Sequence, residues 1–495
     1  MKRSLTNWRP IVVVAMLGVG ALVVLAPVVV IACFGLVLLA WMANSRPAWV
    51  VMGLLIWLPF EGWILKFIPG SSALLVVPDV VCLLLAFVLL GRLLLGKIAP
   101  AEKSHLRLLL GPPLMLALVG LASWGVNLIP AVDALYWFRV YLRFVPLALV
   151  LAGDDVRDIV SAKLPVIASF VIIVQSAIGI AQYVGGEGVA RFFWPGQYAL
   201  GAVASQVDTF ATVGTRVVAG TLGHYNAYGM TLVLWVAVLL GVASDRWKVL
   251  SSTHQLMVLA AVSSGSILVI LSQSRQSVAM LVVLFVVWLI RAGTLSTRFR
   301  AAVVAVGAIT ILYMTTDAAI GIDALISRLS SLGDAWYWTV DVAKNRGYVV
   351  TSVASAVLKR APLIGVGPGS MGSSYGSLLG PVGVSVLGLN QASARFVGDV
   401  GWVSVLAQVG VFGVLSLVWL CRRVLQAMSR PGVLSHTILE GTGVLAVLII
   451  GMSASSLLTY KGPSSVLWVL YGLVITSGAS AMRGSLLVDN LTEDK

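Results

Sequence analysis

Long apolar runs separated by short polar breaks extend along nearly the whole chain of 495 residues. A transmembrane helix needs about 20 mainly apolar residues to cross about 30 Å of hydrocarbon. By this hydropathy criterion the pattern predicts about 12–14 transmembrane helices, the first near residues 10–25 and the last near 464–481. We therefore predict an all-α integral membrane protein whose first partner is the lipid bilayer.

Two stretches, 184–221 and 317–400, are too polar and too rich in glycine to span a membrane. The second contains aromatic residues and the helix-like run "YVVTSVASAVLKR", so we predict a large, partly helical loop. These breaks divide the chain into an N-terminal transmembrane bundle (1–183), an extracytoplasmic loop (184–221), core transmembrane helices (222–316), a large extracytoplasmic loop (317–400), C-terminal transmembrane helices (401–481) and a cytoplasmic tail (482–495).

Composition supports the membrane class, because 59% of the residues are hydrophobic and 11% charged, against about 45–50% and 25% in soluble domains. The three cysteines, Cys33, Cys82 and Cys421, are far apart in apolar runs, so we predict packing roles for them. The carboxylates show no cluster of the kind that magnesium needs. We expect no metal, no cofactor and no nucleic-acid partner. The N-terminus resembles a signal peptide without a cleavage site, which favours a retained first span.

The distribution of positive charge predicts the orientation, since short cytoplasmic loops collect Lys and Arg. With the N-terminus inside, 20 of the 33 Lys and Arg residues fall on the inner side, which predicts that both termini are cytoplasmic. The outer segments hold nine arginines and four lysines: Lys66, Arg139, Arg143, Arg191, Arg216, Arg275, Arg328, Lys344, Arg346, Lys359, Arg360, Arg395 and Lys461. Because arginine pairs bidentately with phosphate, this face suggests a phosphorylated ligand.

Arg139 and Arg143 in "YWFRVYLRF" are four residues apart and therefore project from one face of a helix. Ionisable residues inside a membrane segment are candidates for function. Two structural alternatives stay open for them: their side chains extend to the membrane interface, or they pair with Asp133 or Asp79.

Two glycine-containing motifs also draw attention. "GTLGHYNAYG" (220–229) opens a span at its outer end, where free N–H groups near Asn226 offer an anion site and His224 is the only outward histidine. "KRAPLIGVGPGSMG" (359–372) resembles a phosphate loop but lacks its lysine and hydroxyl and follows a helix instead of a strand. We interpret it as a turn that ends a short helix at Pro362 and Gly365, beside Lys359 and Arg360.

Four motifs in order resemble the bacterial O-antigen ligase/polymerase superfamily. They are "GTLGHYNAYG", "LSQSRQSVAML", "NRGYVVTSVASAVLKRAPLIGVGPGSM" and "FVGDVGWVSVLAQVGVFGVL", and together they cover about residues 210–415. The resemblance implies a fold like that of the membrane-embedded C-type glycosyltransferases. It also implies transfer of a glycan from a polyprenyl diphosphate carrier to a glycan or lipid acceptor on the outer face of the cytoplasmic membrane.

The resemblance implies catalytic roles for Arg275 and Arg346, which correspond to the functional arginines of the family. Where ligases of this family carry a histidine, this chain has Asp399, and Val400 replaces the usual asparagine, which favours a polymerase over a ligase. We predict Asp399 as the general base, with a salt bridge to Arg395 as the alternative, and His224 as the second candidate. The remaining candidates for substrate binding are Arg139, Arg143, Arg216, Asn226, Lys359, Arg360 and Arg395.

Two other functions are compatible with the sequence. A ligase that attaches the glycan to lipid or protein would share the site and differ only in the acceptor. A transporter of polysaccharide or lipid-linked oligosaccharide would explain the spans and the basic residues, but it needs polar side chains near the membrane midplane, and the predicted spans contain few.

Overall fold

The computed structural model describes residues 27–68, 71–195, 218–291, 346–371, 382–389, 397, 400–455 and 457–493. In these residues all regular secondary structure is helical and no β-strand occurs, as predicted. In chain order the longer helices are α2 (Pro27–Ser45), α3 (Pro47–Trp57), α5 (Val77–Leu94), α6 (Pro100–Asn127), α7 (Ala131–Leu142), α9 (Asp154–Phe193), α11 (Tyr225–Arg246), α12 (Ser252–Leu271), α13 (Arg275–Arg291), α20 (Gly401–Met428), α21 (Ser435–Ala446) and α23 (Lys461–Glu493).

Shorter elements connect these helices. They are α4 (Glu61–Leu65), η2 (Ser71–Val76), α8 (Val145–Val150), η4 (Trp247–Val249), α16 (Arg346–Tyr348), η6 (Val349–Val353), α17 (Ala354–Arg360), α18 (Val382–Val386), η7 (Val447–Gly451), α22 (Met452–Ala454) and η8 (Leu457–Thr459). Among them, η6 and η7 are π-helical turns.

Six helices in the described residues are long and apolar enough to cross a membrane: Leu74–Leu94, Pro100–Asn127, Asp154–Phe193, Tyr225–Val249, Ser252–Leu271 and Gly401–Met428. The chain is therefore a multi-pass membrane protein by the length and composition of its helices. The predicted spans near 10–25 and 301–316 lie outside the described residues, so the total of 12–14 spans stays a prediction.

Proline divides two runs that the hydropathy pattern treats as single helices. The run 48–65 forms α3 and α4 with Pro59 between them, and the run 135–152 forms α7 and α8 with Pro146 in the first turn of α8. Proline has no N–H and cannot continue the hydrogen-bond ladder of a preceding helix. The second break matters for function, because Arg143 lies in it, directly after the last residue of α7.

The predicted loop 184–221 begins later than the sequence suggested. Helix α9 continues to Phe193, and it bends at Gly186, whose φ of 69° and ψ of −154° are not helical. Glycine adopts positive φ without a steric penalty, which permits the bend. The apolar pattern weakens at this position, but the helix resumes beyond it. Residues 196–217 of this loop are outside the described part of the chain.

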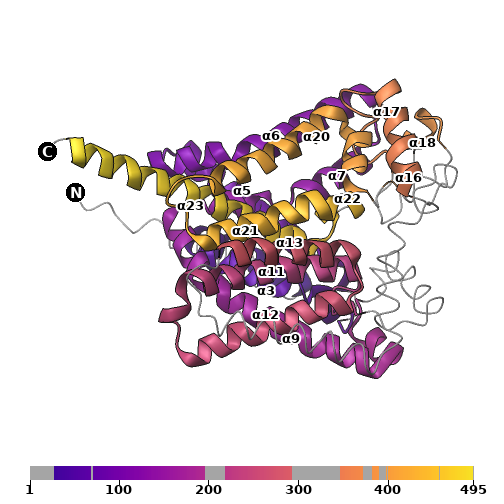
Figure 1. Cartoon of the computed structure of the whole chain (residues 1–495). Helices are drawn as coiled ribbons and strands as arrows, with labels where there is room; N and C mark the ends of the chain where they lie inside the picture. Colours follow the sequence, from indigo (N-terminus) through magenta and orange to yellow (C-terminus); the bar gives the residue numbers. More distant parts are fainter. Residues whose placement is uncertain are drawn as a thin grey trace.

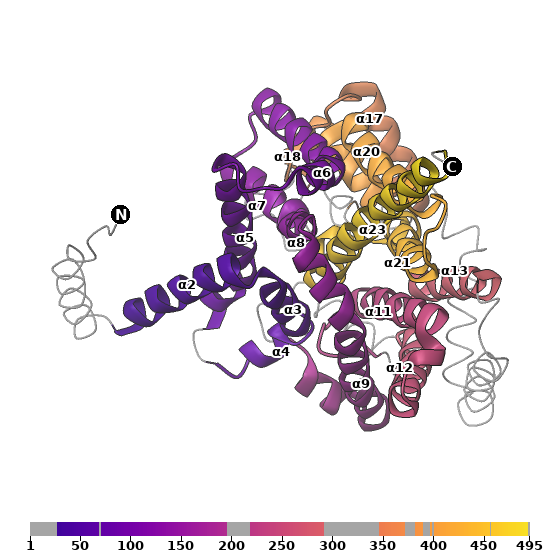
Figure 2. The same cartoon turned by 90° about the vertical axis from the view of Figure 1, so that its left-hand side faces the viewer.

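Helix α11 is the most buried of the six long spans, and it lies among α9, α12, α13 and α21 in Figure 2. It packs against α9, α12, α13, α21 and α23, and 89% of its most apolar window is buried inside the protein. The corresponding windows of α5 and α6 are only 28% and 33% buried, and Phe87 and Leu94 of α5 are largely exposed. A helix that is apolar on all sides is stable only in a core or in lipid, so α11 fills the core while α5 and α6 present apolar surface to the bilayer.

The described parts of the predicted large loop gather at one end of the bundle (Figure 1). There η6, α17 and α18 form a second hydrophobic cluster with the start of α20, which includes Val353, Val357, Val384, Val403 and Ala407. Helix α23 leaves the bundle at the opposite end in the same view. We call the end that carries α16–α18 and the start of α11 the cavity end.

The turn after α17 pairs its backbone with a break in α20. Helix α17 ends at Arg360, which confirms the predicted turn ending a helix, but the turn does more than reverse the chain. The N–H of Val366 donates to the carbonyl of Ala407 at 2.8 Å, and the N–H of Val411 donates to the carbonyl of Pro362 at 2.8 Å. At the break, Gly410 has a φ of 67°. Non-helical backbone inside a membrane bundle is stable only where protein groups satisfy it, and this turn does so for α20.

Substituting Gly410 by alanine should destabilise the fold by at least about 2 kcal/mol. A left-handed conformation costs a non-glycine residue about 1–2 kcal/mol. In addition, the added Cβ would lie 2.3 Å from the carbonyl carbon of Leu363. Thermal unfolding in detergent measures this effect. Gly53→Ala is the control, since nothing lies within 4 Å of its Cβ position inside α3; it should be neutral or slightly stabilising. Equal midpoints for the two variants would contradict the proposed role of this break.

Candidate functional site

A cavity of about 310 Å³ opens at the cavity end, between α4, η2, α7, the start of α11, η8 and the start of α23. Four charged side chains line it: Glu61, Arg139, Arg143 and Lys461. Tyr136, Thr221, Thr459 and Tyr460 contribute polar atoms, and leucine, valine and proline side chains form the remaining walls. Charged groups on apolar walls suit a ligand that has both an anionic and an apolar part.

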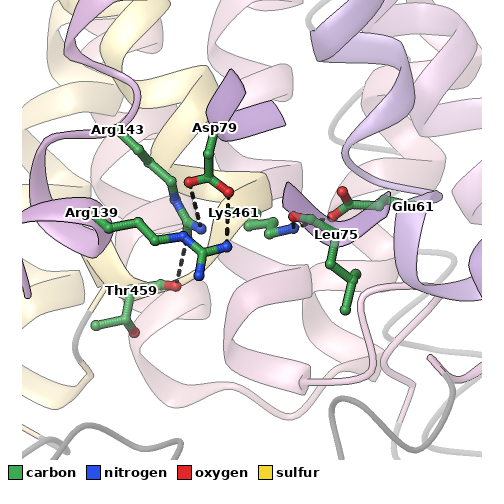
Figure 3. A network of polar contacts seen from close by, with 7 residues as sticks. All are labelled: Glu61, Leu75, Asp79, Arg139, Arg143, Thr459 and Lys461. Carbon is green, nitrogen blue, oxygen red and sulfur yellow. Dashed lines mark hydrogen bonds and ion pairs between the residues drawn. The ribbon is translucent and has the colours of Figure 1, made fainter. Parts of the chain in front are cut away.

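Arg139 of α7 and Arg143, directly after this helix, share one carboxylate (Figure 3). Arg139 Nη2 lies 2.9 Å from Asp79 Oδ2, and Arg143 Nη1 lies 4.0 Å from Asp79 Oδ1. Of the alternatives that the sequence left open, the structure thus shows pairing with Asp79. Arg143 also donates from Nη2 to the carbonyl of Thr459 at 3.1 Å, and its side chain is only 7% exposed. Two guanidinium groups that share one carboxylate keep a net positive charge on this wall.

A second ion pair closes the other side of the cavity (Figure 3). Lys461 Nζ lies 2.6 Å from Glu61 Oε2 and donates to the carbonyl of Leu75 at 2.9 Å. The Glu61 side chain is 4% exposed, and its Oε1 atom is buried without a hydrogen-bond partner among the described residues. Together with Arg139, Arg143 and Asp79, these groups place three cations and two carboxylates around the cavity, so the site carries a net positive charge.

His224 directly precedes α11 and contacts Tyr460, and its neighbour Asn226 links two of the predicted motifs. Its Nδ1 accepts from the N–H of Asn226 at 3.2 Å, which leaves the proton on Nε2 to donate to Tyr460 Oη, also at 3.2 Å. Ser274 Oγ donates to Asn226 Oδ1 at 2.8 Å, which fixes the turn before Arg275 to the start of α11. Through Tyr460, which lines the cavity, His224 contacts the wall of the cavity, whereas Arg275 is not among the lining residues.

The surroundings of His224 lower its pKa to about 4, because the side chain is desolvated between Tyr225 and Tyr460. His224 stays a candidate base from the sequence, with a pKa below the ordinary value of histidine. Burial disfavours the charged imidazolium. At neutral pH the imidazole is neutral and its position is fixed by two hydrogen bonds.

We expect the stability to fall as the pH drops from about 6.5 to about 4, because in this window the unfolded chain binds a proton at His224 that the folded chain does not. Thermal midpoints measured across this range should decrease toward acid, and His224→Gln should flatten the dependence. His254→Gln, at an exposed histidine of α12, is the control and should keep the wild-type slope. Identical slopes for wild type and His224→Gln would contradict the assigned burial.

Other predicted site residues lie elsewhere or outside the described part. Arg360 donates from Nη1 to the carbonyl of Val386 at 2.7 Å and, like the exposed Lys359, belongs to α17 and does not line the cavity. Arg346 begins α16, and its side chain is not described. Three further predicted residues lie outside the described residues: Arg216, Arg395 and Asp399.

Two of the outer cations have structural roles. Lys66 donates from Nζ to the carbonyl of Arg191 at 3.1 Å and to those of Phe192 and Trp194, which places a positive charge at the C-terminus of α9. Arg191 pairs with Glu187 one turn earlier at 2.5 Å. Fewer of the predicted outer cations can therefore contact a ligand than the sequence suggests.

Sequence reasoning missed Glu61, Lys461, Thr459 and Tyr460 as members of the site. Glu61 and Lys461 each interrupt an apolar stretch, and a charge in such a position is a signal for function or pairing. Their pairing could not be recognised, because 400 residues separate the two partners. Among the described residues, no group of three or more His, Cys, Asp or Glu side chains lies close enough to hold a metal ion.

Comparison with known proteins does not assign the chain to a family or this cavity to a function. The chain matches no protein-family model, and the comparison with curated proteins finds no match.

Proposed function

We propose that the chain is a membrane glycosyltransferase that polymerises or transfers oligosaccharide units from a polyprenyl diphosphate carrier at the outer face of the cytoplasmic membrane. The observation that carries the proposal is the cavity lined by Arg139, Arg143 and Lys461 inside an apolar helical bundle. A diphosphate attached to a polyprenyl chain combines strong negative charge with a long apolar tail. The cationic walls suit the diphosphate, and the apolar surface of the bundle suits the tail.

In the proposed reaction a hydroxyl oxygen of the acceptor sugar attacks the anomeric carbon of the donor. The bond between that carbon and the diphosphate oxygen breaks, and polyprenyl diphosphate leaves with the electron pair. The hydroxyl proton passes to a base, and a single displacement inverts the anomeric centre. Arg139, Arg143 and Lys461 would stabilise the charge that develops on the leaving diphosphate, which is often the largest contribution to catalysis.

Two residues are candidates for the base, each for a separate reason. Asp399 stays the candidate from the sequence. Within the described residues, Glu61 is the carboxylate that lines the cavity, and its Oε1 atom has no hydrogen-bond partner there. A base must come within hydrogen-bond reach of the hydroxyl that it deprotonates. Asp399→Asn and Glu61→Gln should therefore be measured side by side.

The proposal is tested with purified protein in nanodiscs and a synthetic lipid-linked repeat unit. Longer glycans together with released polyprenyl diphosphate identify a polymerase, and transfer only to an added lipid or protein acceptor identifies a ligase. Arg139→Ala should lose turnover, and Arg191→Ala, which removes an arginine outside the cavity, should keep it. Movement of intact donor across a membrane without any bond cleavage would favour the transporter and contradict the proposal.

The orientation is tested by cysteine labelling of intact cells in a background without Cys33, Cys82 and Cys421. Ser385, exposed on α18 at the cavity end, and Ser429, exposed after α20, serve as sites. If the positive charges are distributed as in other membrane proteins, an impermeant maleimide should label Ser385→Cys and spare Ser429→Cys. The reverse pattern would place the cavity on the cytoplasmic side and contradict the proposed donor topology.

A further inference from the structure

Two guanidinium groups without an acidic partner among the described side chains lie at the end of the bundle opposite the cavity. Arg423 belongs to the last turns of α20, and Arg430 follows this helix in the loop before α21. Arg423 Nε and Arg430 Nη1 are both buried and have no hydrogen-bond partner in the part of the chain that the structure describes. Neither arginine forms an ion pair with a described carboxylate, although Arg92, Arg139 and Arg157 do.

The positive charges of Arg423 and Arg430 repel each other. Burial and the neighbouring charge of Arg423 lower the pKa of Arg430. Helix α21 begins five residues after Arg430, and Asp245 caps its start. The Asp245 carboxylate already accepts from the backbone N–H groups of Ser435 and His436 at 3.1 and 2.8 Å. A buried cationic nitrogen without an acceptor is costly. An anion with several oxygen atoms would satisfy both groups at once, and guanidinium is well suited to phosphate.

The surroundings indicate an anion that carries apolar chains. The Trp419 ring lies 5.6 Å from the guanidinium of Arg423, and it packs on Gly111 of α6, where an added Cβ would lie 2.7 Å from the indole. A tryptophan beside a cation is typical of the membrane interface. Large exposed apolar side chains then follow α20 toward its middle: Leu425, Val418, Leu415 and Phe412. Their spacing of three or seven residues places them along one side of the helix.

We propose that Arg423 and Arg430 bind the phosphate of an anionic membrane lipid, with the acyl chains along the exposed apolar side of α20. The site is separate from the cavity, because α20 begins in the cluster with α17 and α18 and Arg423 lies more than five turns further along the helix. The inference is independent of the proposed enzymatic activity. A lipid bound here would hold the C-terminal end of α20 and the loop before α21 in place.

The test uses delipidated full-length protein in a neutral detergent and thermal unfolding as the readout. Phosphatidylglycerol should raise the midpoint by about 2 °C or more over the same amount of phosphatidylcholine. The double variant Arg423→Gln/Arg430→Gln should lose this difference. Arg291→Gln removes the same charge from an exposed position at the last residue of α13, away from α20, and should keep it.

Three results would overturn the proposal. They are equal midpoints with the two lipids for the wild type, reproduction of the full shift by inorganic phosphate alone, and an equal loss in Arg291→Gln. If the glutamine double variant does not fold, Arg423→Lys/Arg430→Lys keeps both charges but loses the planar fork. It should retain a smaller preference for phosphatidylglycerol, and an undiminished preference would contradict phosphate binding by these guanidinium groups.

Discussion

Replacing Arg143 by alanine should lower turnover of the lipid-linked donor by about 10²–10³-fold, as expected when one preorganised donor to a developing negative charge is removed. Arg143 is the most buried cation of the cavity: its side chain is 7% exposed, donates to the carbonyl of Thr459 and pairs with Asp79. A fixed cation stabilises the transition state without reorganising during the reaction. Arg143→Lys should recover only part of the rate, because lysine lacks the bidentate fork.

Folded protein should survive this substitution, because Asp79 keeps its 2.9 Å contact with Arg139. Turnover at saturating donor and donor affinity are measured separately, on variants that elute as monodisperse protein. Arg191→Ala is the matched control at the same end of the bundle. If a well-folded Arg143→Ala protein keeps the turnover of the wild type, the role of Arg143 is limited to its structural contacts with Asp79 and Thr459. This result would remove the main support for the proposed chemistry.

Replacing Lys461 by methionine should destabilise the protein by about 3–5 kcal/mol, the usual cost of leaving one member of a buried ion pair without its partner. Lys461 is the group that neutralises Glu61, whose side chain is 4% exposed. Methionine preserves the length of the side chain but removes its charge. The carboxylate of Glu61 would then remain in the cavity wall with an unpaired charge, and the cavity end should open first on heating.

The double variant Glu61→Gln/Lys461→Met should recover most of that loss, since neither side chain then carries a charge. Unfolding of the wild type, the two single variants and the double variant gives the coupling energy of the pair. Additive losses, without coupling, would show that the 2.6 Å contact between the two groups does not contribute to the stability of the folded protein.

The sequence by itself determined the helical class and the positions of most helices. In lipid every backbone N–H and C=O must be satisfied within the chain, so an apolar run of sufficient length has few alternatives to a helix. The run that forms α11 was predicted on this basis. The spacing of four residues predicted that Arg139 and Arg143 project to one side, although Arg143 directly follows the last residue of α7. Helix ends were less predictable, because Pro59 and Pro146 divide runs whose hydropathy is continuous, and α9 continues past a bend at Gly186 into a stretch that is polar in sequence.

Only the tertiary structure decided which charges meet. Asp79, Arg143 and Thr459 are distant in sequence, as are Glu61 and Lys461, and each charge alone is compatible with a contact to the membrane interface. The reason is physical: an ion pair in an apolar bundle depends on the distance between two helices, and hydropathy contains no information on which helices are neighbours. The same holds for "LIGVGPG": Gly365 lies against the backbone of Ala407 to Val409 in α20, whereas Gly367 and Gly369 lie against Ile129 and Asp133.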